Sequence, residues 1–140
     1  MRSIKLRQTE LKIKNDDRGP LMEDDHYVVK DPRGYVVSLS KTRYENHIVA
    51  ESGHTDVPVG DIMKAVEKPF IIYESSQNPS RDVYYGICSS VHPSLYVKVP
   101  VQVNESEQCG EVVTAFLSKK ISGGINETKG PKYVSYSNQL

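Results

Sequence analysis

The stretch from Leu95 to Val103 constrains the fold more than any other part of the chain, because apolar and polar residues alternate along its whole length. Successive side chains of a β-strand point to opposite faces of a sheet, so the odd-numbered residues share one face. Such a strand is stable when its apolar face packs on a core. Pro100 has no N–H to donate, so we expect this strand to lie at a sheet edge or to be bulged there.

Other strands are predicted where short runs of β-branched and aromatic residues end at turn residues. The residues Asp31–Gly34 separate two such runs, and a polar loop separates the next two, so two hairpins are expected. The runs lie at residues 27–29, 35–37, 70–73, 83–87, 111–117 and 133–136.

The register of the third hairpin decides which polar residues meet. If residues 95–103 and 111–117 pair symmetrically, Val103 lies opposite Glu111, and Lys98 and Thr114 fall together on the face away from the core. A slip of one residue would separate them.

Two helices are predicted between the first and second hairpins. Thr42 and Glu45 have the spacing of a capping box, so the first helix should begin there and run to about residue 52 or 53. Pro69 ends the second helix. One apolar face of that helix has the spacing i, i+3, i+4, i+7, formed by Val59, Ile62, Met63 and Val66.

The length of 140 residues fits a single domain, which we assign to residues 26–140, with residues 1–25 as an N-terminal extension. Lys plus Arg and Asp plus Glu are equal at 18 each, so the chain lacks the overall basic field of many nucleic-acid binders. Attraction for a polyanion must therefore be local. The ends are the more basic parts, since residues 117–140 hold four lysines and one acidic residue, Glu127.

The cysteine pattern and the hydropathy limit the class of protein. Cys88 and Cys109 lack the spacing of a metal site or a redox motif, and both free thiols and one disulfide remain open. The absence of a secretion signal favours free thiols. No apolar run approaches the roughly 18 residues needed to span a bilayer. We expect the protein to act in a cytoplasm, its own or that of a target cell reached as part of a larger protein.

The most informative chemical feature is the group Arg43, His47 and His54. A helix over this region would align them on one side, and imidazole titrates at about pH 6.5 while guanidinium stays charged. RNA cleavage without a metal needs a base for the 2′-hydroxyl, an acid for the departing 5′-oxygen and positive charge for the phosphate. The histidines fit the base and acid roles, in an order that the sequence does not fix. Arg43 fits the phosphate.

Further residues are candidates for binding the substrate. Thr114 can donate its hydroxyl to a phosphate oxygen, and Tyr85, like Tyr84, can donate likewise or stack on a base. Positive charge is available from Lys98, Lys119 and Lys120. Each candidate also has a structural alternative, as a packed core residue or a solvated surface group. Acidic residues outside 16–25 are scattered and no cofactor-binding motif occurs, so neither a metal nor a cofactor is expected.

Four blocks of the sequence resemble the phage-associated nucleases of the barnase/EndoU/colicin/RelE-like superfamily, over about residues 38–121. They are Ser40–Ile48 with a second histidine seven residues later, Ala65–Ser75, Tyr96–Val99 and Gly110–Phe116. The resemblance implies an α+β fold, metal-independent RNA cleavage, often as a toxin, and roles for His47, His54 and Thr114. Relatives often have arginine immediately before the second histidine, where this chain has Gly53, so Arg43 or Lys98 would have to bind the phosphate instead.

We therefore predict two helices followed by an antiparallel sheet of about four strands, with a β extension at the N-terminus. The favoured function is a toxin-like endoribonuclease that leaves 2′,3′-cyclic phosphate and 5′-hydroxyl ends. RNA, with tRNA as one candidate, is the expected partner, and an immunity protein or antitoxin is a second one; no membrane partner is expected. The alternative is a catalytically silent RNA- or protein-binding module on the same fold. A third reading, an assembly adaptor, would require a large exposed apolar patch.

Overall fold

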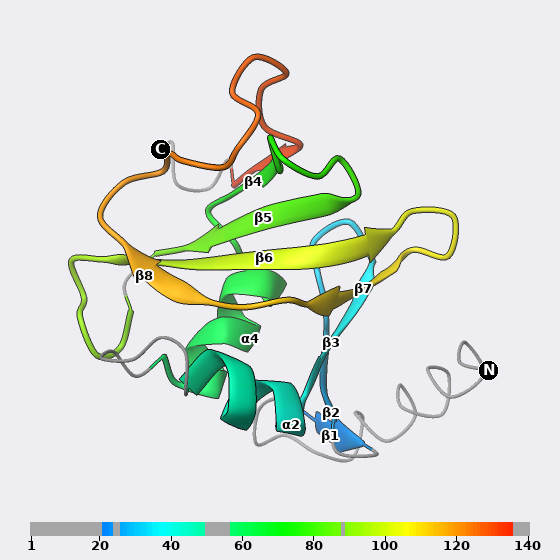
Figure 1. The fold of residues 1–140 in the computed structure, drawn as a ribbon, viewed down its shortest axis with the longest axis vertical. Helices are drawn as coiled ribbons and strands as arrows, with labels where there is room; N and C mark the ends of the chain where they lie inside the picture. Colours follow the sequence, from blue (N-terminus) through cyan, green and yellow to red (C-terminus); the bar gives the residue numbers. More distant parts are fainter. Residues whose placement is uncertain (1–20, 24–25, 50–56, 88, 136–140) are drawn as a thin grey trace.

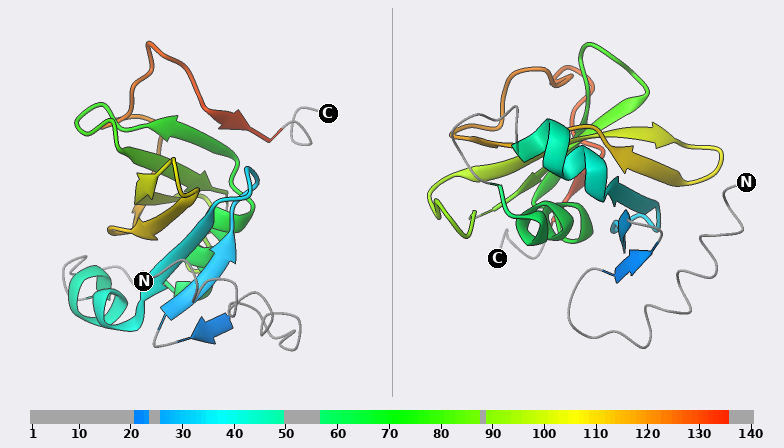
Figure 2. Two further views of the ribbon diagram at one scale, coloured as in Figure 1. Left: turned by 90° about the vertical axis from the view of Figure 1, so that its right-hand side faces the viewer. Right: turned by 60° about the horizontal axis from the view of Figure 1, so that its bottom comes forward.

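The computed structural model describes residues 21–23, 26–49, 57–87 and 89–135. In these residues nine strands form one sheet, and the helical segments lie against one of its faces (Figures 1 and 2). The strands are β1 (Leu21–Glu23), β2 (His26–Lys30), β3 (Val36–Ser40), β4 (Ile71–Glu74), β5 (Arg81–Gly86), β6 (Tyr96–Asn104), β7 (Cys109–Val112), β8 (Phe116–Ser118) and β9 (Tyr133–Val134). The helical segments are α2 (Lys41–Arg43), the π-helical η1 (Tyr44–Val49) and α4 (Val59–Glu67). None of the described helices is long and apolar enough to cross a membrane.

The predicted architecture of two helices followed by about four antiparallel strands is wrong. The strand order is β1-β2-β3-β7-β6-β5-β4-β9, with β8 also paired to β6, so the sheet is larger and mixed. The hairpin β2–β3 does not stand apart as an extension, because β3 pairs in parallel with β7 from Val36↔Cys109 to Ser38↔Glu111. Backbone hydrogen bonds make this pairing, and alternation of apolar residues marks strands without showing which edges will meet.

Strand β6 is the centre of the sheet, with β5 along one edge and both β7 and β8 along the other. The predicted core face is confirmed, because the alternate valines of this strand are buried. Pro100 lies in a strand with neighbours on both sides, and the irregularity falls on the neighbour. Residues 113–115 leave the ladder beside it, and only the N–H of Val113 bonds to the Pro100 carbonyl, at 2.9 Å.

Along β7 the predicted register of the third hairpin is wrong by one residue. Val103 lies opposite Gly110, and the strand expected over residues 111–117 is divided into β7 and β8. β8 keeps the predicted register, which places Phe116 directly across the ladder from Lys98, whereas Thr114 lies in the bend of residues 113–115, outside the ladder.

The helices cover the valine face of the sheet. The predicted apolar face of α4 is confirmed, and its residues Ile62, Met63 and Val66 are buried in the main core. A Cβ added to Gly86 of β5 would lie 2.7 Å from that of Ala65, so glycine is what allows α4 to lie directly on the sheet.

The first helix begins slightly earlier than the capping box predicted. The hydroxyl of Ser40 accepts a hydrogen bond from the Arg43 N–H at 2.8 Å, so Ser40 is the cap and α2 starts at Lys41. The helix then widens into η1, whose Ile48 is buried in the core. Its predicted end at residue 52 or 53 lies outside the described residues.

The second face of the sheet is covered by the segment that follows β8 (Figure 1). Val83, Tyr85 and Ile125 form a second apolar cluster there. The segment is held at its far end by the Gly124 carbonyl, which accepts from the Ser76 N–H at 2.9 Å. Both faces of the sheet are therefore occupied, which leaves strand edges, loops and surface clefts for function.

Candidate functional site

Arg43 connects the first helix to the bend between β7 and β8. Its side chain is exposed, and Nη1 donates to the Val113 carbonyl at 3.1 Å. Thr114 is the next residue and is half-buried. A guanidinium carries several N–H donors, so this contact orients Arg43 and leaves donors for a phosphate. Two of the residues predicted for the site thus belong to segments in direct contact.

The predicted histidines are only partly covered by the structure. The backbone of His47 lies in η1, four positions after Arg43. In a π-helical turn, as in an α-helical one, residues four apart lie near the same side. The side chain of His47 and all of His54 lie outside what is described, so their base and acid roles stay predictions.

Lys98 is bound by the protein itself. Its side chain is buried at 8% exposure, and Nζ donates to the carbonyls of Ser122 at 3.1 Å and Gly123 at 2.7 Å. The aromatic rings of Tyr85 and Phe116 lie beside it, with centroids 5.5 and 5.4 Å from Nζ. Burial lowers the pKa of Lys98. The predicted phosphate contact has little room, because carbonyls and rings already surround the ammonium.

Tyr85 is a packing residue in this geometry. Its side chain has no exposed surface, its ring packs edge-on to Tyr96 with centroids 6.2 Å apart, and its hydroxyl lies 3.5 Å from the Ser122 carbonyl. Burial, with a smaller contribution from Tyr73 and Glu127, raises the pKa of Tyr85 to about 12. The ring therefore presents no face on which a base can stack.

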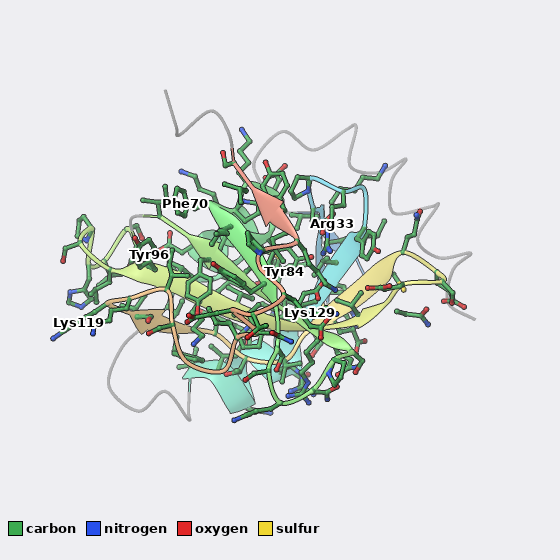
Figure 3. The ribbon with its side chains drawn as sticks, turned by 90° about the horizontal axis from the view of Figure 1, so that it is seen from above. Arg33, Phe70, Tyr84, Tyr96, Lys119 and Lys129 are labelled. Atoms are coloured by element: carbon green, nitrogen blue, oxygen red, sulfur yellow. The ribbon has the colours of Figure 1, made fainter. Side chains whose placement is uncertain are left out.

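Lys119 and Lys120 are the cations that remain accessible. Both are exposed and follow β8 in a turn closed by Ser118, whose hydroxyl donates to the Lys120 carbonyl at 2.7 Å. Figure 3 shows Lys119 at the margin of the molecule, away from the labelled Arg33 and Lys129. Neither lysine forms an ion pair within the described ranges, so their positive charge is not neutralised there.

Sequence reasoning missed Phe116 as a surface residue. It is 40% exposed, although it lies in the apolar run of residues 111–117. The signal was the predicted register itself, in which Phe116 lies opposite Lys98, on the face away from the valines of β6.

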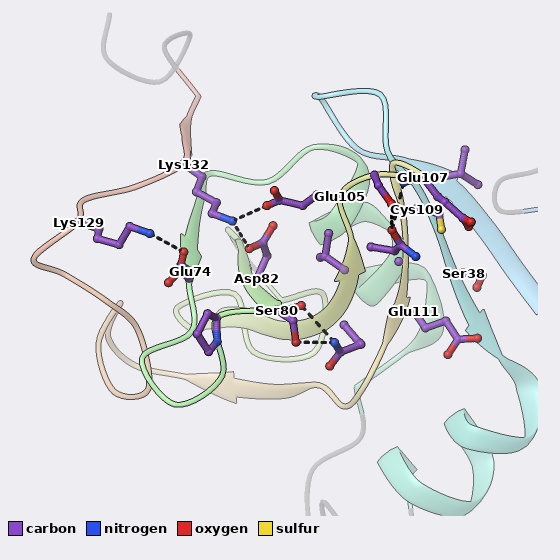
Figure 4. Close-up of a pocket in the computed structure, with 17 residues that line it drawn as sticks. Ser38, Glu74, Ser80, Asp82, Glu105, Glu107, Cys109, Glu111, Lys129 and Lys132 are labelled. Carbon is purple, nitrogen blue, oxygen red and sulfur yellow. Dashed lines mark hydrogen bonds and ion pairs between the residues drawn. The ribbon is translucent and has the colours of Figure 1, made fainter.

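A cleft of about 1070 Å³ lies at the other end of β6 (Figure 4). Its lining includes two lysines, Lys129 and Lys132, and the five acidic residues Glu74, Asp82, Glu105, Glu107 and Glu111. Both lysines are paired: Lys129 lies 2.9 Å from Glu74, and Lys132 lies 2.8 Å from Asp82 and 3.2 Å from Glu105. The lining is thus net negative, which opposes binding of an RNA backbone.

The thiol of Cys109 also lines this cleft and is free. Burial, together with the negative charges of Glu107 and Glu111, raises its pKa, which disfavours the nucleophilic thiolate. No group of His, Cys, Asp and Glu among the described residues is arranged to hold a metal ion.

A buried charge network lies beneath the cleft. Arg33 Nη2 lies 2.9 Å from Asp31 Oδ2 and 3.0 Å from Asp82 Oδ2, and the Tyr84 hydroxyl donates to Asp31 at 2.6 Å. The guanidinium also lies 4.4 Å from the ring centroid of Tyr35. Burial and the bond to Asp31 raise the pKa of Tyr84. These contacts tie the β2–β3 turn to β5, and sequence reasoning missed them because the partners are far apart in the chain.

Comparison of the chain with models of protein families, with curated proteins and with solved structures finds no match.

Proposed function

We propose that the protein is a metal-independent endoribonuclease whose site lies where the first helix meets the bend of residues 113–115. The hydrogen bond from Arg43 to the Val113 carbonyl supports this, because it links the helix that carries His47 to the segment that carries Thr114. The acidic cleft is the less suitable surface for RNA, since its lysines are neutralised.

In this proposal His47 and His54 supply the base that removes the 2′-hydroxyl proton and the acid that protonates the 5′-oxygen. Arg43 stabilises the pentacovalent phosphate by charge and by paired hydrogen bonds, and Thr114 donates its hydroxyl to a phosphate oxygen. Lys98 and Tyr85 support the fold of the surrounding strands instead of contacting RNA.

The second candidate function is an RNA-binding module without catalysis. One observation favours it: Lys98 and Tyr85, both expected at the substrate, are engaged in internal contacts. A surface retaining Arg43, Lys119 and Lys120 suits binding of a polyanion whether or not the histidines react.

The test is incubation of the purified protein with total RNA in EDTA. Wild type should cut RNA, and His47→Ala and His54→Ala should each lower the rate about 10²- to 10⁴-fold, because each removes general acid–base catalysis. The exposed His92 gives a matched control, and His92→Ala should cut at the wild-type rate.

The products and the pH profile sharpen this test. Cut ends should be 2′,3′-cyclic phosphates and 5′-hydroxyls, and the rate should pass through a maximum between two limbs in the imidazole range. If wild type binds RNA and cuts none, the binding module replaces the enzyme. Equal rates for wild type and both histidine variants would remove the histidines from the mechanism.

A further inference from the structure

Phe116 is a surface aromatic residue whose position is fixed from within. It lies in β8 directly across the ladder from Lys98, and its ring centroid is 5.4 Å from the Lys98 ammonium. A cation beside an aromatic ring is attracted to it, which favours one orientation of the ring. Because the side chain is still 40% exposed, part of the ring remains open to a ligand.

The lysine that contacts the ring is itself held in place. Its Nζ bonds to the carbonyls of Ser122 and Gly123, at 3.1 and 2.7 Å. Gly123 and Gly124 have φ of +84° and +71°, values that other residues rarely adopt, so this turn depends on glycine. The Gly124 carbonyl in turn accepts from Ser76 at 2.9 Å. The turn, Lys98 and Phe116 thus form one connected arrangement.

Positive charge lies on both sides of Phe116 along the chain. Arg43 bonds to Val113, three residues before it, and Lys119 and Lys120 follow it by three and four residues. The stretch 112–126 contains no acidic residue. An aromatic ring between cations is the arrangement on which proteins bind single-stranded nucleic acid, with bases stacked on the ring and phosphates beside the cations.

We propose that the substrate is single-stranded RNA and that Phe116 stacks on one of its bases, while Lys119 and Lys120 contact adjacent phosphates. The proposal rests on the proposed action on RNA and names its substrate class. Bases in a duplex are already stacked on their neighbours, so the ring can reach only an unpaired base.

Binding of a fluorescent 2′-O-methyl RNA oligonucleotide, which lacks the 2′-hydroxyl that cleavage needs, tests this directly, either single-stranded or annealed to its complement. Wild type should bind the single strand more tightly than the duplex. Phe116→Ala should weaken single-strand binding roughly tenfold, within the range of about 1–3 kcal/mol for one stacked base. Phe116→Tyr retains the ring and should bind like wild type, and urea unfolding of each variant separates a binding loss from a folding loss.

A second readout uses the absence of tryptophan and the presence of only two phenylalanines. Phe116→Trp introduces a single tryptophan, which can be excited apart from the nine tyrosines and whose emission should be quenched by single-stranded RNA through stacking. Phe70→Trp is the matched control, because Phe70 lines a separate cleft beside α4, and its emission should not change.

The outcomes distinguish the two proposals. If wild type binds and cuts RNA but Phe116→Ala binds it equally well, or if duplex binds as tightly as the single strand, the stacking proposal is overturned and the ribonuclease proposal survives. If wild type neither binds nor cuts any RNA, the proposed function is overturned, and the stacking proposal with it.

Discussion

The two ends of strand β6 bury cations in opposite ways. At the acidic cleft, Arg33 and Lys132 meet the carboxylates of Asp31, Asp82 and Glu105 at 2.8 to 3.2 Å. At the other end Lys98 has carbonyl oxygens and aromatic rings around its ammonium. Charges cancel in the first arrangement, whereas in the second the positive charge remains.

Because of this difference, positive charge is concentrated at one place in a chain with 18 basic and 18 acidic residues. Carboxylates gather at the cleft, and the stretch 112–126 has none. Net charge is thus a poor guide to local potential, because salt screens exposed charges over about 10 Å and each surface acts largely by its own residues.

The largest effect should come from breaking the network at Asp82, which is 1% exposed and pairs with both Arg33 and Lys132. Asp82→Asn leaves two cations without their shared carboxylate and should lower the free energy of unfolding by about 3–5 kcal/mol. Urea denaturation measures the loss. Glu107→Gln, an exposed change in the same cleft, should stay within about 0.5 kcal/mol. A loss below 1 kcal/mol for Asp82→Asn would mean that the network does not stabilise the fold.

Reversing the charge of the exposed Lys119 and Lys120 tests whether the electrostatic potential differs between the two ends of β6. The pair Lys119→Glu and Lys120→Glu removes the two proposed phosphate contacts, so the fall in RNA affinity between 50 and 200 mM salt should become roughly tenfold smaller. The pair Lys64→Glu and Lys68→Glu changes the net charge equally at other exposed positions and should leave this salt dependence as in wild type. Equal effects of the two pairs would show that overall charge, rather than a local surface, attracts RNA.

The alkaline limit of stability should reveal the burial of Tyr85. Its folded pKa is about 12 and its ordinary value is 10.0, so above pH 10 the unfolded chain loses a proton that the folded chain keeps. The contribution of the protonated Tyr85 hydroxyl to the free energy of unfolding is complete below pH 10. It is lost as the pH rises toward 12, by about 1 kcal/mol per pH unit. Between pH 9 and 11 the free energy of unfolding of wild type should therefore fall more steeply than that of Tyr85→Phe, which has no hydroxyl at this position. Parallel curves would contradict the burial of this hydroxyl.

The smallest change in stability is expected at Lys98. Lys98→Met removes a buried charge whose carbonyl partners, on the exposed Ser122 and Gly123, can bind water instead, so the free energy of unfolding should change by less than about 1 kcal/mol. The turn should nevertheless loosen, and trypsin should cut after Lys119 and Lys120 faster than in wild type. Lys68→Met changes an exposed lysine and is the matched control: trypsin should cut it after Lys119 and Lys120 at the wild-type rate.

Local signals predicted local structure well. The spacing of apolar residues located α4, and the alternation around Val99 identified the buried face of β6, because each pattern reflects one element packing on one core. The first helix was also located, but its cap was not, since Ser40 and Thr42 are both good caps and the following backbone decides between them.

Long-range features were not predictable in the same way. Three such features are the parallel pairing of β3 with β7, the register at Gly110 and the ion pair of Arg33 with Asp82. In each, the sequence of one segment does not show which other segment it will contact. For the site, Arg43 contacts the bend that holds Thr114, whereas Lys98, which was predicted to bind phosphate, is buried.

The pairing of Val36 with Cys109 also has a consequence for how the protein is made. More than half of the chain separates these residues, and loop closure of that length is slow compared with formation of a hairpin or a helix. While the ribosome is still adding the intervening residues, the amino-terminal hairpin has an open edge that nothing fills. Completion of the sheet must therefore await translation of β7, and until then that edge is the part of the nascent protein most exposed to aggregation.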